Sequence, residues 1–220
     1  AILKPMTEES LSTARPRSVL AALCLADEPN IDPATAREVL TAFARSIGKG
    51  DGTGHFSTLA DSTALEVSKS MWTAQLVNSL VGEFRQRGQL ERESVGGLLG
   101  MLQVRKWPTS PQENTAFVAD TVRRLNSGNE DEVVVCALTV TEAAYERRLT
   151  VIPGLVKALL AQLTMASPQR CSSAWALGWL AGGHLSDRGV WQPNEEETSA
   201  LGKALDAASL DESDTRFWLV

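Results

Sequence analysis

One short pattern recurs along the whole chain: a small residue followed by leucine, inside stretches with helical hydrophobic spacing. The copies are Ala22-Leu23, Ala64-Leu65, Gly97-Leu98, Ala137-Leu138 and Ala176-Leu177, with the bulkier Trp218-Leu219 as a sixth. Successive leucines lie 33 to 42 residues apart. Small residues let neighbouring helices approach closely, and the leucine fills the core that they share. A period of this length is typical of repeat architectures, in which each unit is one supersecondary motif.

Each copy is followed, after a break, by a second stretch that is apolar on one helical face. Asp32 and Pro33 form an N-cap with proline at the first helical position, and Val39, Leu40 and Phe43 then share one face. Glycine and proline breakers separate such stretches: Gly48 to Gly54, Gly88, Trp107-Pro108, Ser127-Gly128, Ser167-Pro168, Gly182-Gly183 and Gln192-Pro193. The β-prone Glu132–Val135 runs into residues that read better as helix. We therefore predict an all-α fold.

The pattern divides the chain into helical hairpins. The predicted repeats are residues 10–50, 55–88, 90–127, 130–167 and 168–209, with the start of a sixth at 213–220. Stacking them gives an α-solenoid of about five hairpins, with Leu23, Leu98, Leu138 and Leu177 buried; the alternative is a non-repetitive helical bundle. The chain starts at Ala1 without methionine, and residues 214–220 read as the beginning of a helix. We therefore expect a fragment of a longer chain.

The segment Arg170-Cys-Ser-Ser-Ala-Trp-Ala-Leu-Gly-Trp-Leu-Ala-Gly182 resembles the first helix of a HEAT repeat, which typically ends in Ala-Leu-Gly-x-Leu-Gly. Glu93–Gly100 and Arg17–Leu23 are looser copies. The resemblance implies a single HEAT-like domain over residues 1–220, wound as a right-handed superhelix. HEAT-like arrays resemble the sensor parts of bacterial signalling NTPases of the STAND or NACHT type, and the high use of alanine, arginine and tryptophan is typical of bacteria.

Bulk properties limit the partners. The formal net charge is −6, which disfavours nucleic acid and anionic membranes, because phosphate contacts need clustered lysine and arginine. The three cysteines form no CxxC pair and lie in apolar stretches, as expected for reduced core thiols. No apolar run approaches the length of about 20 residues that spans a bilayer. We expect a cytoplasmic protein.

No catalytic, cofactor or metal site is predicted. Gly48–His55 is rich in glycine, but its spacing is not that of a Walker A loop, and we interpret it as a connection between repeats. His55 and His184 have no ligand spacing to a cysteine or to each other. Glu195–Glu197 reads as an acidic first turn that complements the helix dipole.

Three arginines recur near the repeat period: Arg45, Arg85 and Arg123, each late in a predicted second helix. Stacking of the repeats would align them on the concave face. They are the candidate partner-binding residues, for an acidic peptide or a nucleic-acid groove. The alternative interpretation is that each arginine only complements the dipole at the end of its own helix.

The sequence is compatible with three functions. The first is a non-catalytic scaffold or sensor that binds a protein partner, or other domains of the parent chain, along the solenoid surface. The second is a HEAT-like enzyme of the bilin lyase or DNA glycosylase type. The third is a structural spacer. No cofactor is expected for the scaffold or sensor function. The sequence does not identify the partner.

Overall fold

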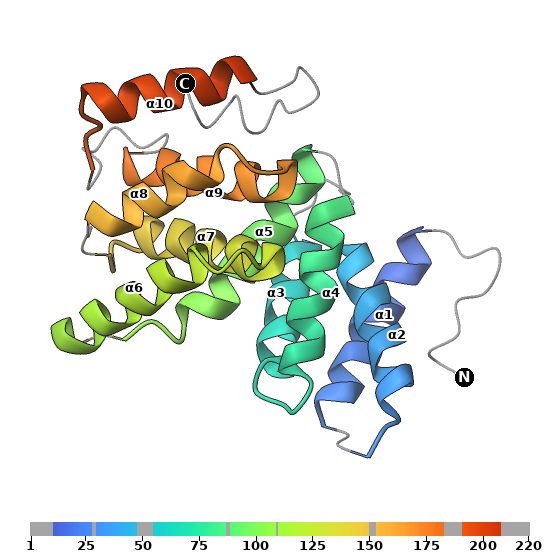
Figure 1. The fold of residues 1–220 in the computed structure, drawn as a ribbon. Helices are drawn as coiled ribbons and strands as arrows, with labels where there is room; N and C mark the ends of the chain where they lie inside the picture. The colour runs from blue at the N-terminus through green and yellow to red at the C-terminus, as the bar shows by residue number, and fades with distance from the viewer. Residues whose placement is uncertain are drawn as a thin grey trace. The chain divides into compact units, whose positions relative to one another are not determined.

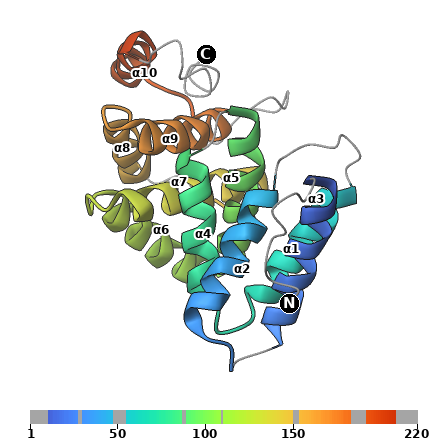
Figure 2. The same ribbon diagram turned by 90° about the vertical axis from the view of Figure 1, so that its right-hand side faces the viewer.

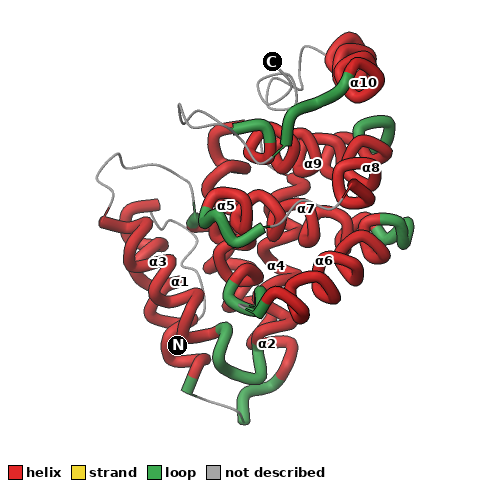
Figure 3. The backbone as a smooth tube through the Cα atoms, turned by 90° about the vertical axis from the view of Figure 1, so that its left-hand side faces the viewer, coloured by secondary structure: helices red, strands yellow, loops and turns green. Residues whose placement is uncertain are grey.

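The computed structural model describes residues 11–27, 30–47, 55–86, 89–108, 110–149, 153–182 and 191–207. This part of the chain contains ten α-helices and no strand (Figures 1 and 3), which confirms the all-α prediction for the described residues. The helices are α1 (Leu11–Ala26), α2 (Pro33–Ser46), α3 (His55–Val67), α4 (Thr73–Gln86), α5 (Gln89–Val104), α6 (Pro111–Leu125), α7 (Glu130–Tyr145), α8 (Pro153–Gln162), α9 (Ser167–Leu180) and α10 (Glu195–Ala207). Each of the first five predicted repeats spans two consecutive helices and starts within one residue of the first of them.

Side-chain caps explain several of the helix starts. The Asp32 carboxylate accepts a hydrogen bond from the Thr35 backbone N–H at 3.0 Å, and Pro33 follows as predicted. Ser110 caps α6 in the same way. Asn129 accepts from the N–H groups of Asp131 and Glu132, so the β-prone residues that follow continue as helix. Local hydrogen bonding, rather than propensity, determines where these helices begin.

The chain divides into two compact units, residues 1–102 and 103–220. The boundary falls near the end of α5. The expectation of one continuous repeat domain stays a prediction.

In unit 1, a helix packs on the helix two places further along the chain. α1 packs on α3, and α2 packs on α4, while α1 also contacts its hairpin partner α2 (Figure 2). The hydroxyl of Ser18 donates to that of Ser46 at 3.1 Å, which joins α1 to α2. The largest fully buried side chains of unit 1 are Leu25, Leu40, Phe43, Trp72, Leu76, Leu80, Phe84 and Leu99.

Unit 2 repeats this arrangement. α7 packs most extensively against α9, and α6 packs on α8. α6 also contacts α7, and α8 contacts α9 and α10. Nine consecutive residues of α7, Val133 to Thr141, are buried, so this helix is enclosed on all sides. Gln162 donates to the carbonyl oxygen of Leu125 at 2.9 Å and so ties α8 to the end of α6.

The four leucines that the repeat pattern assigns to the core divide into two groups. Leu98, Leu138 and Leu177 are buried, as predicted. Leu23 is only half-buried, so the prediction for it is wrong. The buried side of α1 is formed by Val19, Ala22 and Leu25 instead. Leu23 borders the side of α1 that none of the described helices covers, because helical spacing defines an apolar face without defining what lies against it.

Candidate partner-binding surface

Arg45 and Arg85 lie in the last turns of α2 and α4, two helices that pack on each other. The Arg45 Nε lies 3.2 Å from Glu83 Oε1. The Glu83 side chain is only 9% exposed, whereas that of Arg45 is 65% exposed. A carboxylate this deep needs a cationic or hydrogen-bonding partner. Arg45 therefore has a structural task, because it joins α2 to α4 through a largely buried charge.

Arg85 and Arg123 are exposed. Arg123 lies in the last turn of α6, and its Nε donates to Asp120 Oδ1 at 3.2 Å. This hydrogen bond, with the negative charge of Asp120, raises the pKa of the Arg123 guanidinium. The structure thus places Arg45 and Arg85 at the ends of two packed helices in unit 1. Arg123 belongs to unit 2, and its alignment with the other two stays a prediction.

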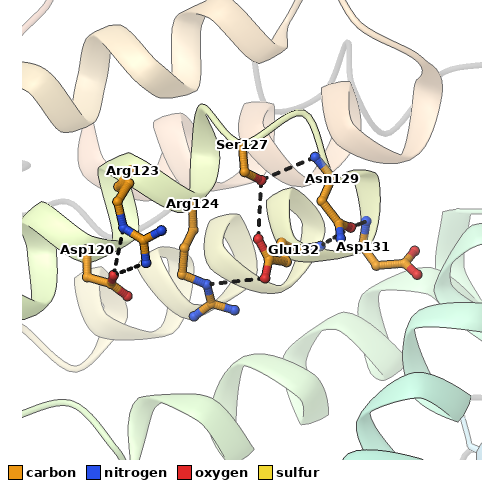
Figure 4. A network of polar contacts seen from close by, with 7 residues as sticks. All are labelled: Asp120, Arg123, Arg124, Ser127, Asn129, Asp131 and Glu132. Carbon is orange, nitrogen blue, oxygen red and sulfur yellow. Dashed lines mark hydrogen bonds and ion pairs between the residues drawn. The ribbon is translucent and has the colours of Figure 1, made fainter.

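A network of polar contacts surrounds the turn between α6 and α7 (Figure 4). Its members are Asp120, Arg123, Arg124, Ser127, Asn129, Asp131 and Glu132. Arg124 lies 4.0 Å from Glu132, and the Ser127 hydroxyl donates to the same carboxylate at 3.2 Å. Charges of both signs alternate here. This surface therefore resembles a stabilised helix junction more than a strip of unopposed positive charge.

Aromatic side chains form a second feature of unit 2. Tyr145, the last residue of α7, is 55% exposed, and its ring meets that of Trp179 edge-on, with centroids 5.2 Å apart. Trp179 is half-buried. The other described tryptophans, Trp72, Trp107, Trp175 and Trp191, are buried. The sequence analysis did not find this exposed pair, because helical spacing does not indicate which aromatic side chains meet.

Further large apolar side chains are exposed. They are Leu20 on α1, Leu59 on α3, Met71 before α4 and Met165 before α9. Leu20 and Leu59 lie on helices that pack on each other. None of these residues was singled out from the sequence, because apolar spacing alone does not separate a covered face from an open one. Single exposed side chains of this kind are normal on a protein surface, and only a contiguous group of them is typical of an interaction surface.

The candidate chemical residues are partly outside the described ranges. This applies to residues 48–54 of the glycine-rich stretch and to His184; His55 begins α3. Among the described residues, no three His, Cys, Asp or Glu side chains are grouped as metal ligands. Glu195–Glu197 forms the first turn of α10, where Glu197 accepts from the Asn194 N–H and Asn194 caps Glu197 in return.

The cysteines differ from one another. Cys136 and Cys171 are buried, as expected. Burial raises the pKa of the Cys136 thiol to about 11, so this group stays neutral near neutral pH. Cys24 is exposed, and its assignment to the core is wrong. It lies on the same open side of α1 as Leu20.

Comparison with known proteins gives no relative: no family model matches the chain, and neither a curated protein nor a solved structure matches it. Within the described ranges, no helix has both the length and the apolar character needed to cross a membrane.

Proposed function

We propose that this chain is a non-catalytic protein-interaction module, a scaffold or sensor built as a right-handed α-solenoid of HEAT-like hairpins and working in the cytoplasm. The observation that supports the proposal is the alternate packing of helices. α1 packs on α3 and α2 on α4, and in unit 2 α7 packs on α9 and α6 on α8. First helices of the hairpins thus contact first helices, and second helices contact second helices.

This packing has a direct consequence for binding. Each hairpin buries its apolar face against its neighbours, and the outer faces of the second helices remain open to solvent. On α2 these open positions include Arg37 and Glu38. A row of such faces presents an extended polar surface, on which a partner gains affinity from many small contacts. A module of this kind needs no reactive group.

A protein partner suits the surface better than nucleic acid does. Arg45 faces Glu83 and Arg123 faces Asp120, so two of the three candidate arginines already have carboxylate neighbours. Together with the net charge of −6, this leaves little unopposed positive charge for a phosphate backbone. The partner is a protein, or another domain of the parent chain, that offers a few acidic groups within a polar surface.

The test uses three versions of the chain as bait in cell extract from the source organism. The first is wild type, the second is Arg85→Glu with Arg123→Glu, and the third is Lys69→Glu with Lys106→Glu, which reverses the same number of exposed charges outside the second helices, in the turns that follow α3 and α5. Arg45 is kept, because its replacement would disturb Glu83 in the core. Bound proteins are quantified by mass spectrometry.

A protein that wild type and the third bait retain, and the second bait loses, would support a binding module that uses the candidate arginines. Equal retention by all three would place binding elsewhere on the surface. The absence of any specific partner would contradict the proposal and favour a structural spacer.

A further inference from the structure

α1 is apolar on two opposite sides. Its residues Val19 to Ala26 read Val-Leu-Ala-Ala-Leu-Cys-Leu-Ala without a single polar side chain. One side, with Val19, Ala22 and Leu25, is buried against the rest of unit 1. The other side carries Leu20, which is 50% exposed, and the exposed Cys24, with half-buried Leu23 beside them. Helices that are apolar all round are normally enclosed, as α7 is.

The open side of α1 has the spacing of a helix-pairing seam. Half-buried Arg17 and the exposed Leu20 and Cys24 follow one another on α1 at intervals of three and four residues, and Asp27, the first residue after the helix, continues this stripe three residues further on. The apolar pair is in the middle, and a charge of opposite sign stands at each end.

The stripe is complementary to itself. Arg17 and Asp27 are equally distant from residue 22, and so are Leu20 and Cys24. If a second copy of α1 runs antiparallel with its centre at the same residue, Leu20 faces Cys24 of the other copy and Arg17 faces Asp27. A two-fold axis produces each of these contacts twice. The distance from Arg17 to Asp27 along the helix is about 15 Å, so the seam covers nearly three helical turns.

We propose that the open side of α1 is a homodimer interface, in which two copies of the chain pair α1 antiparallel through Leu20 and Cys24, with Arg17 and Asp27 as reciprocal ion pairs. The self-complementary charges favour a second copy over an unrelated partner, since an unrelated helix would have no reason to match this order of charges. The inference does not depend on the proposed function of the second-helix surface.

The first experiment measures the mass of the 220-residue chain by sedimentation equilibrium over a range of concentrations. Wild type is expected to dimerise, and Leu20→Glu is expected to be a monomer at every concentration at which wild type is a dimer. The matched control is Met71→Glu, since Met71 is 63% exposed and lies outside the stripe; this variant should dimerise like wild type. Circular dichroism verifies that each variant is folded.

The second experiment exchanges the charges and leaves the apolar residues unchanged. Arg17→Glu and Asp27→Arg should each weaken dimerisation roughly tenfold, because both symmetry-related pairs become repulsive. The double variant Arg17→Glu/Asp27→Arg should restore it to within about twofold of wild type, since the pairs are re-formed with reversed signs.

Three results would overturn the proposal. The first is a wild-type chain that is monomeric at all concentrations. This result would overturn the homodimer even if the open side of α1 were found to bind a different protein. The second is a dimer that Leu20→Glu does not weaken. The third is a charge exchange without recovery in the double variant, which would exclude the antiparallel arrangement even if Leu20→Glu failed to fold.

Discussion

At the scale of single residues, the end of α7 departs from common helix chemistry. Arg147 has a φ of 56°, a left-handed conformation that glycine normally occupies after a helix. Its N–H donates to the Ala144 carbonyl at 3.1 Å, and the N–H of Arg148 donates to that of Ala143 at 2.9 Å. These two bonds satisfy carbonyl groups that the helix end would leave open, and they hold Arg147 in its strained conformation.

Replacing Arg147 with glycine should therefore stabilise the fold. Arg147→Gly is expected to raise the free energy of unfolding by about 0.5 to 1 kcal/mol, because glycine adopts this φ without steric cost. Arg147→Ala is the matched control, since it removes the same side chain and keeps the strain. Urea unfolding measures both. A stabilisation shared by the alanine variant would attribute the effect to the arginine side chain instead.

The same helix end holds a perturbed carboxyl group. Burial, with a smaller contribution from the charge of Glu146, raises the pKa of Glu142 in the folded chain. The folded state then binds the proton more tightly than the unfolded state does, so this group favours folding at low pH. Its contribution is lost as the pH rises through the raised pKa.

Glu142→Gln should consequently be more stable than wild type at pH 7, because glutamine has no charge to desolvate. The difference should disappear as the pH falls below the ordinary range of glutamate. Unfolding curves at several pH values from neutral to acidic provide the measurement. Glu38→Gln on the exposed side of α2 is the control, and a pH-independent difference for Glu142→Gln would contradict the assignment.

At the scale of helices, the sequence was most informative about where elements begin and end. The cap predicted at Asp32-Pro33 is confirmed, because its hydrogen bond involves a neighbour three residues along and local sequence is sufficient to predict it. Ser110 and Asn129, which were not predicted as caps, form hydrogen bonds of the same local kind. The covering of each face depends on residues far along the chain. For this reason Leu23 and Cys24 were wrongly predicted to be in the core, although the buried side of α1 is the opposite one. The role of Arg45 in the candidate site could not be predicted from the sequence for the same reason, because its partner Glu83 lies 38 residues away along the chain.

The contact between α2 and α4 gives a prediction at this scale. Arg45→Ala removes the guanidinium that the buried Glu83 carboxylate faces. We expect the free energy of unfolding to fall by about 1 to 2 kcal/mol. This lies between the values for buried and for exposed ion pairs, because Arg45 itself is largely in solvent. Arg85→Ala, one helix away on the same surface, should change stability by less than about 0.5 kcal/mol. Equal effects of the two variants in urea unfolding would refute this structural task for Arg45.

At the scale of the whole molecule, the division into two compact units predicts how a core defect spreads. Leu177 is 1% exposed in the core of unit 2, and Leu177→Asp places a charge there without a partner. Hydrogen exchange should show that α7 and α9 lose protection while α2 and α4 in unit 1 retain it, since repeat-like packing limits coupling to neighbours. Leu59→Asp, at an exposed position, serves as the control. Loss of protection throughout the chain would instead reveal a single cooperative unit.

The distribution of tryptophan has a spectroscopic consequence. Trp72 is the only tryptophan in residues 1–102, whereas residues 103–220 contain five. Intrinsic fluorescence of this chain is therefore dominated by the second half, and the emission of Trp72, which is 1% exposed, is a minor blue-shifted component. A Trp72→Phe chain would emit from unit 2 alone. Subtracting its spectrum from that of wild type isolates one indole, which makes unit 1 observable without any added dye.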